Sequence, residues 1–154
     1  MAYATILAQI KTYMEAVTNC GLVYDYVRWH KDMPAMLALF KTTIGGVSQI
    51  RFWDISRTKT LEVNKVSKEN LRIYTFRIRG FLSLDDSAAT ETTFQTLIEL
   101  VCAKFRNVPT LNATAEAVFP IQVLNTTHVM IGDVLCHMVE MDLTIEESVS
   151  WVES

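Results

Sequence analysis

Glycine and proline are scarce in this sequence, which has five glycines and three prolines among 154 residues. This scarcity argues against a disordered chain. No stretch approaches the roughly 18 apolar residues that a membrane helix needs, so we expect no membrane association. The first residues lack a basic region and enter an amphipathic pattern, so we expect no signal peptide. Half of the residues are hydrophobic and a fifth are charged, which is typical of one globular domain.

Cysteine is also rare, and the motifs of common enzymes are missing. Cys20, Cys102 and Cys136 are widely spaced and form no CxxC, which predicts reduced, mostly buried thiols. The sequence has no GxSxG, Walker A, HExxH or GxGxxG motif. Cys136 and His137 are neighbours, but adjacent residues of a strand point to opposite faces. A metal site made of these two residues and His128 has the same problem and lacks ligand spacing. We therefore predict no enzymatic activity, no cofactor and no metal site.

Charge is distributed unevenly along the chain. The net charge is −3, which makes nonspecific DNA binding a poor expectation. Residues 46–82 contain eight cations and three anions, a net charge of +5, whereas the remainder has six cations and 14 anions. Residues 133–154 contain six acidic residues and no Lys or Arg. Either both segments are solvated strand faces, or the basic and acidic segments meet, within one subunit or between neighbouring subunits.

Helices are predicted from the spacing of apolar residues. These residues recur every three or four positions over residues 3–19, which predicts one amphipathic helix. A second is predicted to start at residues 84–87, where short polar and acidic side chains suit a helix N-terminus, and to run to about residue 107 with its apolar stripe at residues 94–105. A shorter helix is expected at residues 33–40, because Asp32 can act as its N-cap and Pro34 is tolerated in a first helical turn.

Strands are predicted from alternation with period two. Residues 47–56 and 73–81 alternate and are rich in β-branched and aromatic side chains, which predicts two strands of a long hairpin. Polar residues at 57–70 are expected to form its projecting tip. Further extended segments are expected at residues 117–124 and 133–145.

Together these elements predict an α+β domain. We expect a mostly antiparallel sheet of about four strands with a long projecting hairpin and two main helices packed on one face. The predicted domain covers residues 1–146, and an acidic C-terminal tail is expected at residues 147–154.

Three segments carry a resemblance to a known family. They are RIRGFLSLDDSA at residues 77–88, FQTL at residues 94–97 and LCHMVEMDL at residues 135–143. With the order of helix, hairpin, helix and closing strands, they resemble the tail completion, or tail terminator, proteins of long-tailed bacteriophages. The resemblance implies a structural virion protein of the head–tail junction, present in the host cytoplasm during assembly. It implies a ring, usually of six copies, that caps the tail tube and joins it to the head connector proteins.

A ring needs two different, complementary patches on each subunit. The candidate basic patch is on the hairpin, and the candidate acidic patch is on the last strand and tail, where apolar residues would supply affinity. The expected interface residues are Arg57, Lys59, Lys65, Lys68, Asp142, Glu146, Glu147, Trp151 and Val152. We also expect that deleting residues 147–154 weakens assembly without affecting folding.

Arg77 and Arg79 share one face of a predicted strand, and that face should be wet or should meet acidic groups. If it lines the lumen of the ring, it would contact passing DNA only nonspecifically. Other readings of the sequence remain open: another neck or adaptor protein, a tail tube subunit, a small enzyme, or a non-viral protein-binding module.

Overall fold

The computed structural model describes residues 2–28, 31–66, 68–111 and 115–150. Its helical elements are α1 (Ala2–Glu15), α2 (Met33–Phe40), the 3-10 turn η1 (Asp86–Ala88) and α3 (Thr90–Arg106). Its strands are β1 (Leu22–Tyr24), β2 (Lys41–Ile44), β3 (Val47–Val66), β4 (Glu69–Ser83), β5 (Ala117–Val118), β6 (Gln122–Ile131) and β7 (Val134–Ser150). The predicted α+β class is therefore confirmed.

The sheet has seven strands, so the expectation of about four was wrong. Its order is β1-β3-β4-β7-β5, with β2 also paired to β3 and β6 also paired to β7. All pairs are antiparallel except β1 with β3. Strands β1, β2 and β5 have only two to four residues, too few to show alternation. Strand β6 shows no alternation of buried and exposed side chains, because nearly all of its side chains are exposed on both faces.

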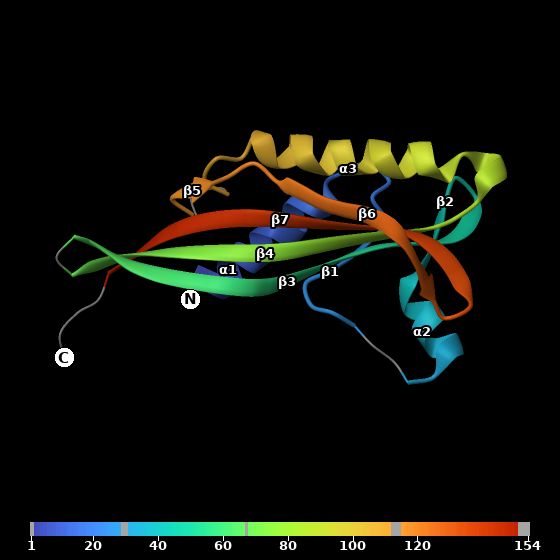
Figure 1. The fold of residues 1–154 in the computed structure, drawn as a ribbon, viewed down its shortest axis with the longest axis horizontal. Helices are drawn as coiled ribbons and strands as arrows, with labels where there is room; N and C mark the ends of the chain where they lie inside the picture. Colours follow the sequence, from blue (N-terminus) through green and yellow to red (C-terminus); the bar gives the residue numbers. More distant parts are fainter. Residues whose placement is uncertain (1, 29–30, 67, 112–114, 151–154) are drawn as a thin grey trace.

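The predicted long hairpin is present as β3 and β4. Its strands continue through residues 57–66, which we had expected to form a polar tip, with register shifts after Arg57 and Asn64. Lys68 adopts a left-handed conformation, φ 62°, immediately before β4 begins. All of β4 pairs with residues 136–150 of β7, so β3, β4 and β7 extend together beyond α3 at the left of Figure 1.

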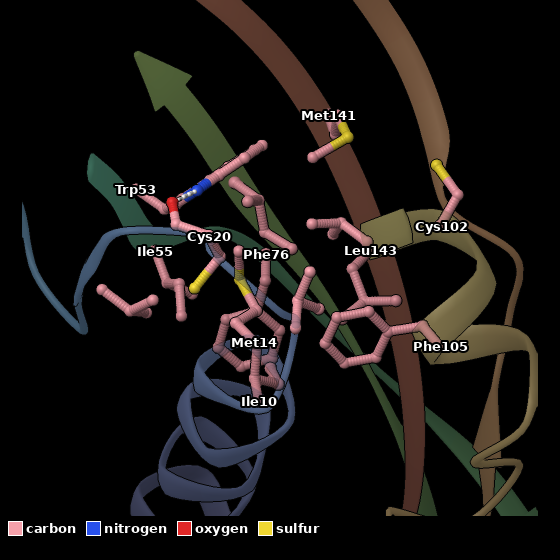
Figure 2. Close-up of a cluster of buried hydrophobic side chains, with 14 of the residues drawn as sticks. Ile10, Met14, Cys20, Trp53, Ile55, Phe76, Cys102, Phe105, Met141 and Leu143 are labelled. Atoms are coloured by element: carbon pink, nitrogen blue, oxygen red, sulfur yellow. Dashed lines mark hydrogen bonds between the residues drawn. The ribbon is translucent and has the colours of Figure 1, made fainter. Parts of the chain in front are cut away.

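The main hydrophobic core lies between the sheet and the two long helices. Both α1 and α3 contribute buried side chains to one cluster on one face of the sheet, as predicted. Figure 2 shows Ile10 and Met14 of α1 near Phe76 of β4, with Phe105 of α3 beside Leu143 of β7. Side chains alternate between the two faces of β4 and β7. Every second side chain of these strands therefore points toward the helices and joins this core.

A smaller core lies on the opposite face, where α2 packs near one end of the sheet (Figure 1). The rings of Phe40, Phe52 and Phe81 stack in sequence, with centroid separations of 3.9 and 4.5 Å. Helix α2 begins as predicted, because the Asp32 carboxylate accepts a hydrogen bond from the Ala35 amide at 3.3 Å. The apolar surface of α2 therefore covers only part of the second face.

Trp53 ties the segment between α1 and β1 to the centre of the sheet. Its indole Nε1 donates a hydrogen bond to the Cys20 carbonyl at 2.7 Å, and its side chain is buried (Figure 2). Gly80 lies opposite Trp53 in the β3–β4 register. A Cβ atom at Gly80 would lie 2.3 Å from the Trp53 ring. Only glycine therefore allows the indole to lie flat across the neighbouring strand.

We predict that Gly80→Ala lowers the free energy of unfolding by about 1–3 kcal/mol, because the added methyl group overpacks the core. Urea denaturation followed by circular dichroism measures this change. In a Trp53→Leu background the same substitution should cost less, since the contacted ring atoms are gone. An equal cost in both backgrounds would contradict this explanation.

Candidate functional site

Arg77 and Arg79 lie on the sheet face away from α1 and α3, and both meet acidic groups. Arg77 Nε and Nη1 donate to Asp142 at 2.6 Å and to Glu140 at 2.8 Å. Arg79 makes two hydrogen bonds to Asp54, at 2.9 and 2.5 Å. Burial raises the pKa of Asp54, and the Arg79 guanidinium opposes this rise. The two arginines are thus neutralised within their own subunit, which leaves little positive charge for phosphate contacts.

The basic hairpin and the acidic last strand meet within one subunit, one of the two alternatives left open by the sequence. Arg77 of β4 pairs with Glu140 and Asp142 of β7. Arg72 lies opposite Glu147 in the register but pairs with Glu62 of its own hairpin, and Glu146 lies opposite the uncharged Ile73. Lys65 Nζ contacts Glu116 Oε1 at 2.7 Å, just before β5, and lies 3.2 Å from the Ser148 hydroxyl oxygen of β7. Charge complementarity between the two segments is therefore used largely inside the fold.

The remaining predicted interface residues have different surroundings. The guanidinium of Arg57 lies 4.1 Å from the ring centre of Tyr3, whereas Lys59 and Lys68 are exposed. Trp151 and Val152 lie outside the described residues.

Glu147 belongs to the folded domain, which corrects the expected boundary at residue 146. It is 6% exposed, and its Oε1 accepts a hydrogen bond from the Tyr74 hydroxyl at 2.5 Å. Burial and this carboxylate together raise the pKa of Tyr74 to about 12. Residues 147–150 continue β7 because their backbone pairs with the start of β4. This long-range pairing leaves no local signal in an acidic, serine-containing segment.

We predict that a chain ending at Glu146 has a free energy of unfolding about 1–3 kcal/mol lower than that of the full chain, because the Tyr74 hydroxyl loses its buried acceptor. A chain ending at Ser150 is the matched control, since it keeps all of β7. Thermal unfolding of both proteins measures the difference. Equal stability of the two would restore the original expectation that residues 147–154 affect assembly alone.

The three cysteines are unpaired and buried, as predicted. Burial raises the pKa of the Cys136 thiol to about 11, and it also raises the pKa values of Cys20 and Cys102. Cys136 points into the α2-side core, whereas the neighbouring His137 points toward α3. The expectation that these adjacent side chains point to opposite faces of the sheet is confirmed.

Strand β6 forms an exposed edge of the sheet. Among the described residues it pairs only with β7, and residues 117–132 contain no charged side chain. Several apolar side chains of the β6–β7 hairpin are exposed: Val123 at 46%, Leu124 at 51%, Met130 at 55% and Leu135 at 44%. Edge strands usually carry lysine, proline or covering elements that prevent pairing with other chains. Strand β6 carries no such charge.

A second open edge lies on the outer side of β3. Strands β1 and β2 pair with β3 only as far as Asp54. Over residues 55–66, the described part of the chain supplies no strand on that side. Leu61 and Val63 are 46% and 39% exposed on this stretch. The two open edges thus lie at opposite sides of the sheet.

Glu91, His128 and His137 come together where α3 begins, a cluster that the sequence reasoning missed. His128 lies directly opposite His137 in the β6–β7 register. Burial lowers the pKa of His137, and the nearby Glu91 opposes this decrease. The signal was present in the sequence: a two-residue turn at Gly132 and Asp133 pairs His128 with His137. The prediction that His128, Cys136 and His137 lack ligand spacing did not take this turn into account, and Glu91 comes from a distant segment of the chain.

Comparison with protein-family models and with curated proteins gives no match for this chain. Within the described residues, no helix combines the length and apolar character required to cross a membrane.

Proposed function

We propose that the protein is a ring-forming structural subunit of the head–tail junction of a long-tailed bacteriophage. In this role it caps the tail tube, joins it to the head connector proteins and becomes part of the virion. The family resemblance of residues 77–88 and 135–143 supports the location. The two open sheet edges support the assembly.

The observation that carries the proposal is the exposed, uncharged edge of β6. A ten-residue strand with unpaired backbone groups and no charge is a template for pairing with another chain. Its exposed apolar side chains add area that becomes buried on contact. Such a strand promotes aggregation of a protein that remains a monomer, whereas in an assembly it provides a binding surface.

The partner that fits this edge is a second copy of the chain. Strand β6 lies at one side of the sheet, and residues 55–66 of β3 offer an edge of similar length at the other. Pairing the first edge with the second edge of a neighbour is heterologous, and such contacts close into rings when the rotation fits. The exposed Lys59 lies on the β3 edge, so part of the predicted basic patch remains in the proposed interface.

We predict that Leu124→Lys abolishes ring formation, because it places a solvated charge on the β6 edge. Leu100→Lys is the matched control, since Leu100 is similarly exposed, at 44%, but lies on α3. Native mass spectrometry and negative-stain electron microscopy over a range of concentrations measure assembly. Closed rings of the parent protein and of the control, with a monomeric Leu124→Lys, are the expected result.

The appearance of the parent assembly distinguishes the alternatives. Long tubes would favour a tail tube subunit over a terminator, which should stop at one ring. A parent protein that stays monomeric at every concentration would contradict self-assembly. Loss of rings in both variants would show that an added lysine disrupts assembly at either position, and would not implicate the β6 edge.

A mixing experiment tests whether the contact is heterologous. Leu61→Lys should block the β3 edge and leave β6 intact, whereas Leu124→Lys should do the reverse. Each variant alone is expected to remain monomeric. An equimolar mixture should form a dimer of one copy of each, because one intact β6 edge then meets one intact β3 edge. Rings or no association in the mixture would contradict this arrangement.

A further inference from the structure

The junction between α3 and the β6–β7 hairpin gathers three side chains of metal-binding type. Glu91, His128 and His137 each offer one donor atom, and these atoms lie within 4.8 Å of one another. The two imidazole rings have a centroid separation of 5.2 Å. We propose that these three residues form a binding site for one Zn²⁺ ion per subunit, with a fourth coordination position open. The proposal goes beyond the assembly role and does not depend on it.

The donor set selects the class of metal. Two histidines and one glutamate are a ligand set found in three-ligand zinc sites that keep an open position. Imidazole nitrogen suits zinc, copper and nickel, whereas Mg²⁺ and Ca²⁺ prefer oxygen ligands throughout. We therefore expect Zn²⁺ to bind much more tightly than Mg²⁺.

Hydrogen bonds orient His137 for coordination through Nδ1. Its Nε2 lies 2.9 Å from the Thr90 hydroxyl oxygen, which also accepts from the Asp85 amide at 2.9 Å. The same hydroxyl donates its one proton to the Asp85 carbonyl at 3.2 Å. When Nδ1 binds a metal ion, Nε2 carries the ring proton and donates it to the Thr90 oxygen, while the Thr90 hydroxyl proton goes to the Asp85 carbonyl. An outer partner that fixes the tautomer in this way is a regular feature of histidine ligands.

The Nδ1 atom of His137 faces Glu91. Nδ1 lies 3.4 Å from Glu91 Oε2. The ring of His137 also stacks on Phe94, with a centroid separation of 5.6 Å and an interplanar angle of 23°. Its side chain is 4% exposed, so this ligand is held in place before any ion arrives.

Small side-chain movements would complete the coordination sphere. At zinc–nitrogen distances of about 2.0–2.1 Å, tetrahedral ligand atoms lie about 3.3 Å apart. The present separations of up to 4.8 Å must therefore shorten by about 1.5 Å at most. Glu91 and His128 are exposed and can supply this movement by rotation, while His137 stays anchored.

The cluster is accessible from two sides. Clefts of about 210 and 180 Å³ are both lined by Glu91, His128 and His137. Either cleft has space for a water molecule, which occupies about 30 Å³ in the liquid, at the fourth position. A bound ion would link the first turn of α3 to the β6–β7 hairpin and so stabilise the exposed edge strand.

The test is calorimetric titration of Zn²⁺ into the chelator-treated full chain, with thermal unfolding in parallel. We expect one Zn²⁺ per chain and a higher Tm in its presence. His128→Ala and Glu91→Gln should each weaken binding at least tenfold. Both side chains are exposed, so the variants should fold, which circular dichroism checks. Glu99→Gln, an exposed substitution on the same helix, is the matched control and should bind like the parent.

Two further measurements separate coordination from nonspecific binding. Co²⁺ should show the visible absorption of a tetrahedral site, and Thr90→Val should lower Zn²⁺ affinity by about 10–100-fold through loss of the outer hydrogen bond. Absence of saturable one-to-one binding, unchanged affinity in His128→Ala and Glu91→Gln, or equally tight Mg²⁺ binding would each overturn the proposal. Repeating the titration with Leu124→Lys separates metal binding from ring formation.

Discussion

The uninterrupted antiparallel pairing of β4 with β7 is the constraint on which the rest of the structure depends. Its register runs from Glu69 opposite Ser150 to Ser83 opposite Cys136 without a bulge. Because side chains alternate between the two faces, this single register places the apolar residues toward α1 and α3 and the arginines on the other face. A slip by one residue would move Arg77 into the core and Phe76 out of it.

The same pairing changes the meaning of the charge pattern. A basic middle segment and an acidic C-terminal segment look, along the sequence, like two surfaces for partners. In the sheet they lie on adjacent strands, and Arg77 contacts both Glu140 and Asp142. What the subunit leaves unsatisfied is mainly the backbone of its edge strands and the apolar side chains beside them. Backbone pairing and apolar burial, rather than charge, therefore underlie the proposed contact between copies.

The β6–β7 hairpin carries both proposals for a physical reason. Its outer edge is open, and its inner face reaches the first turn of α3, where the negatively charged Glu91 is favoured by the helix dipole. The turn at Gly132 aligns His128 with His137 across the hairpin. Occupancy of the cluster would hold β6 in register, which links a local site to the surface proposed for assembly.

Sequence alone determined those elements whose burial is one-sided. The apolar stripes of α1 and α3, the Asp32 cap of α2 and the alternation of β3 and β4 are local patterns, because each element has one face in the core. The shared face of Arg77 and Arg79 followed from the same periodicity.

Only the tertiary structure decided the rest. Strand β6 is exposed on both faces, β1 and β5 are too short for a pattern, and residues 147–150 owe their extended form to backbone pairing with β4. The buried contact of Glu147 with Tyr74, and the meeting of Glu91 with two histidines, join residues far apart in the chain. Periodicity records which side of an element is buried, whereas the identity of a strand's neighbour depends on long-range pairing that no local pattern encodes.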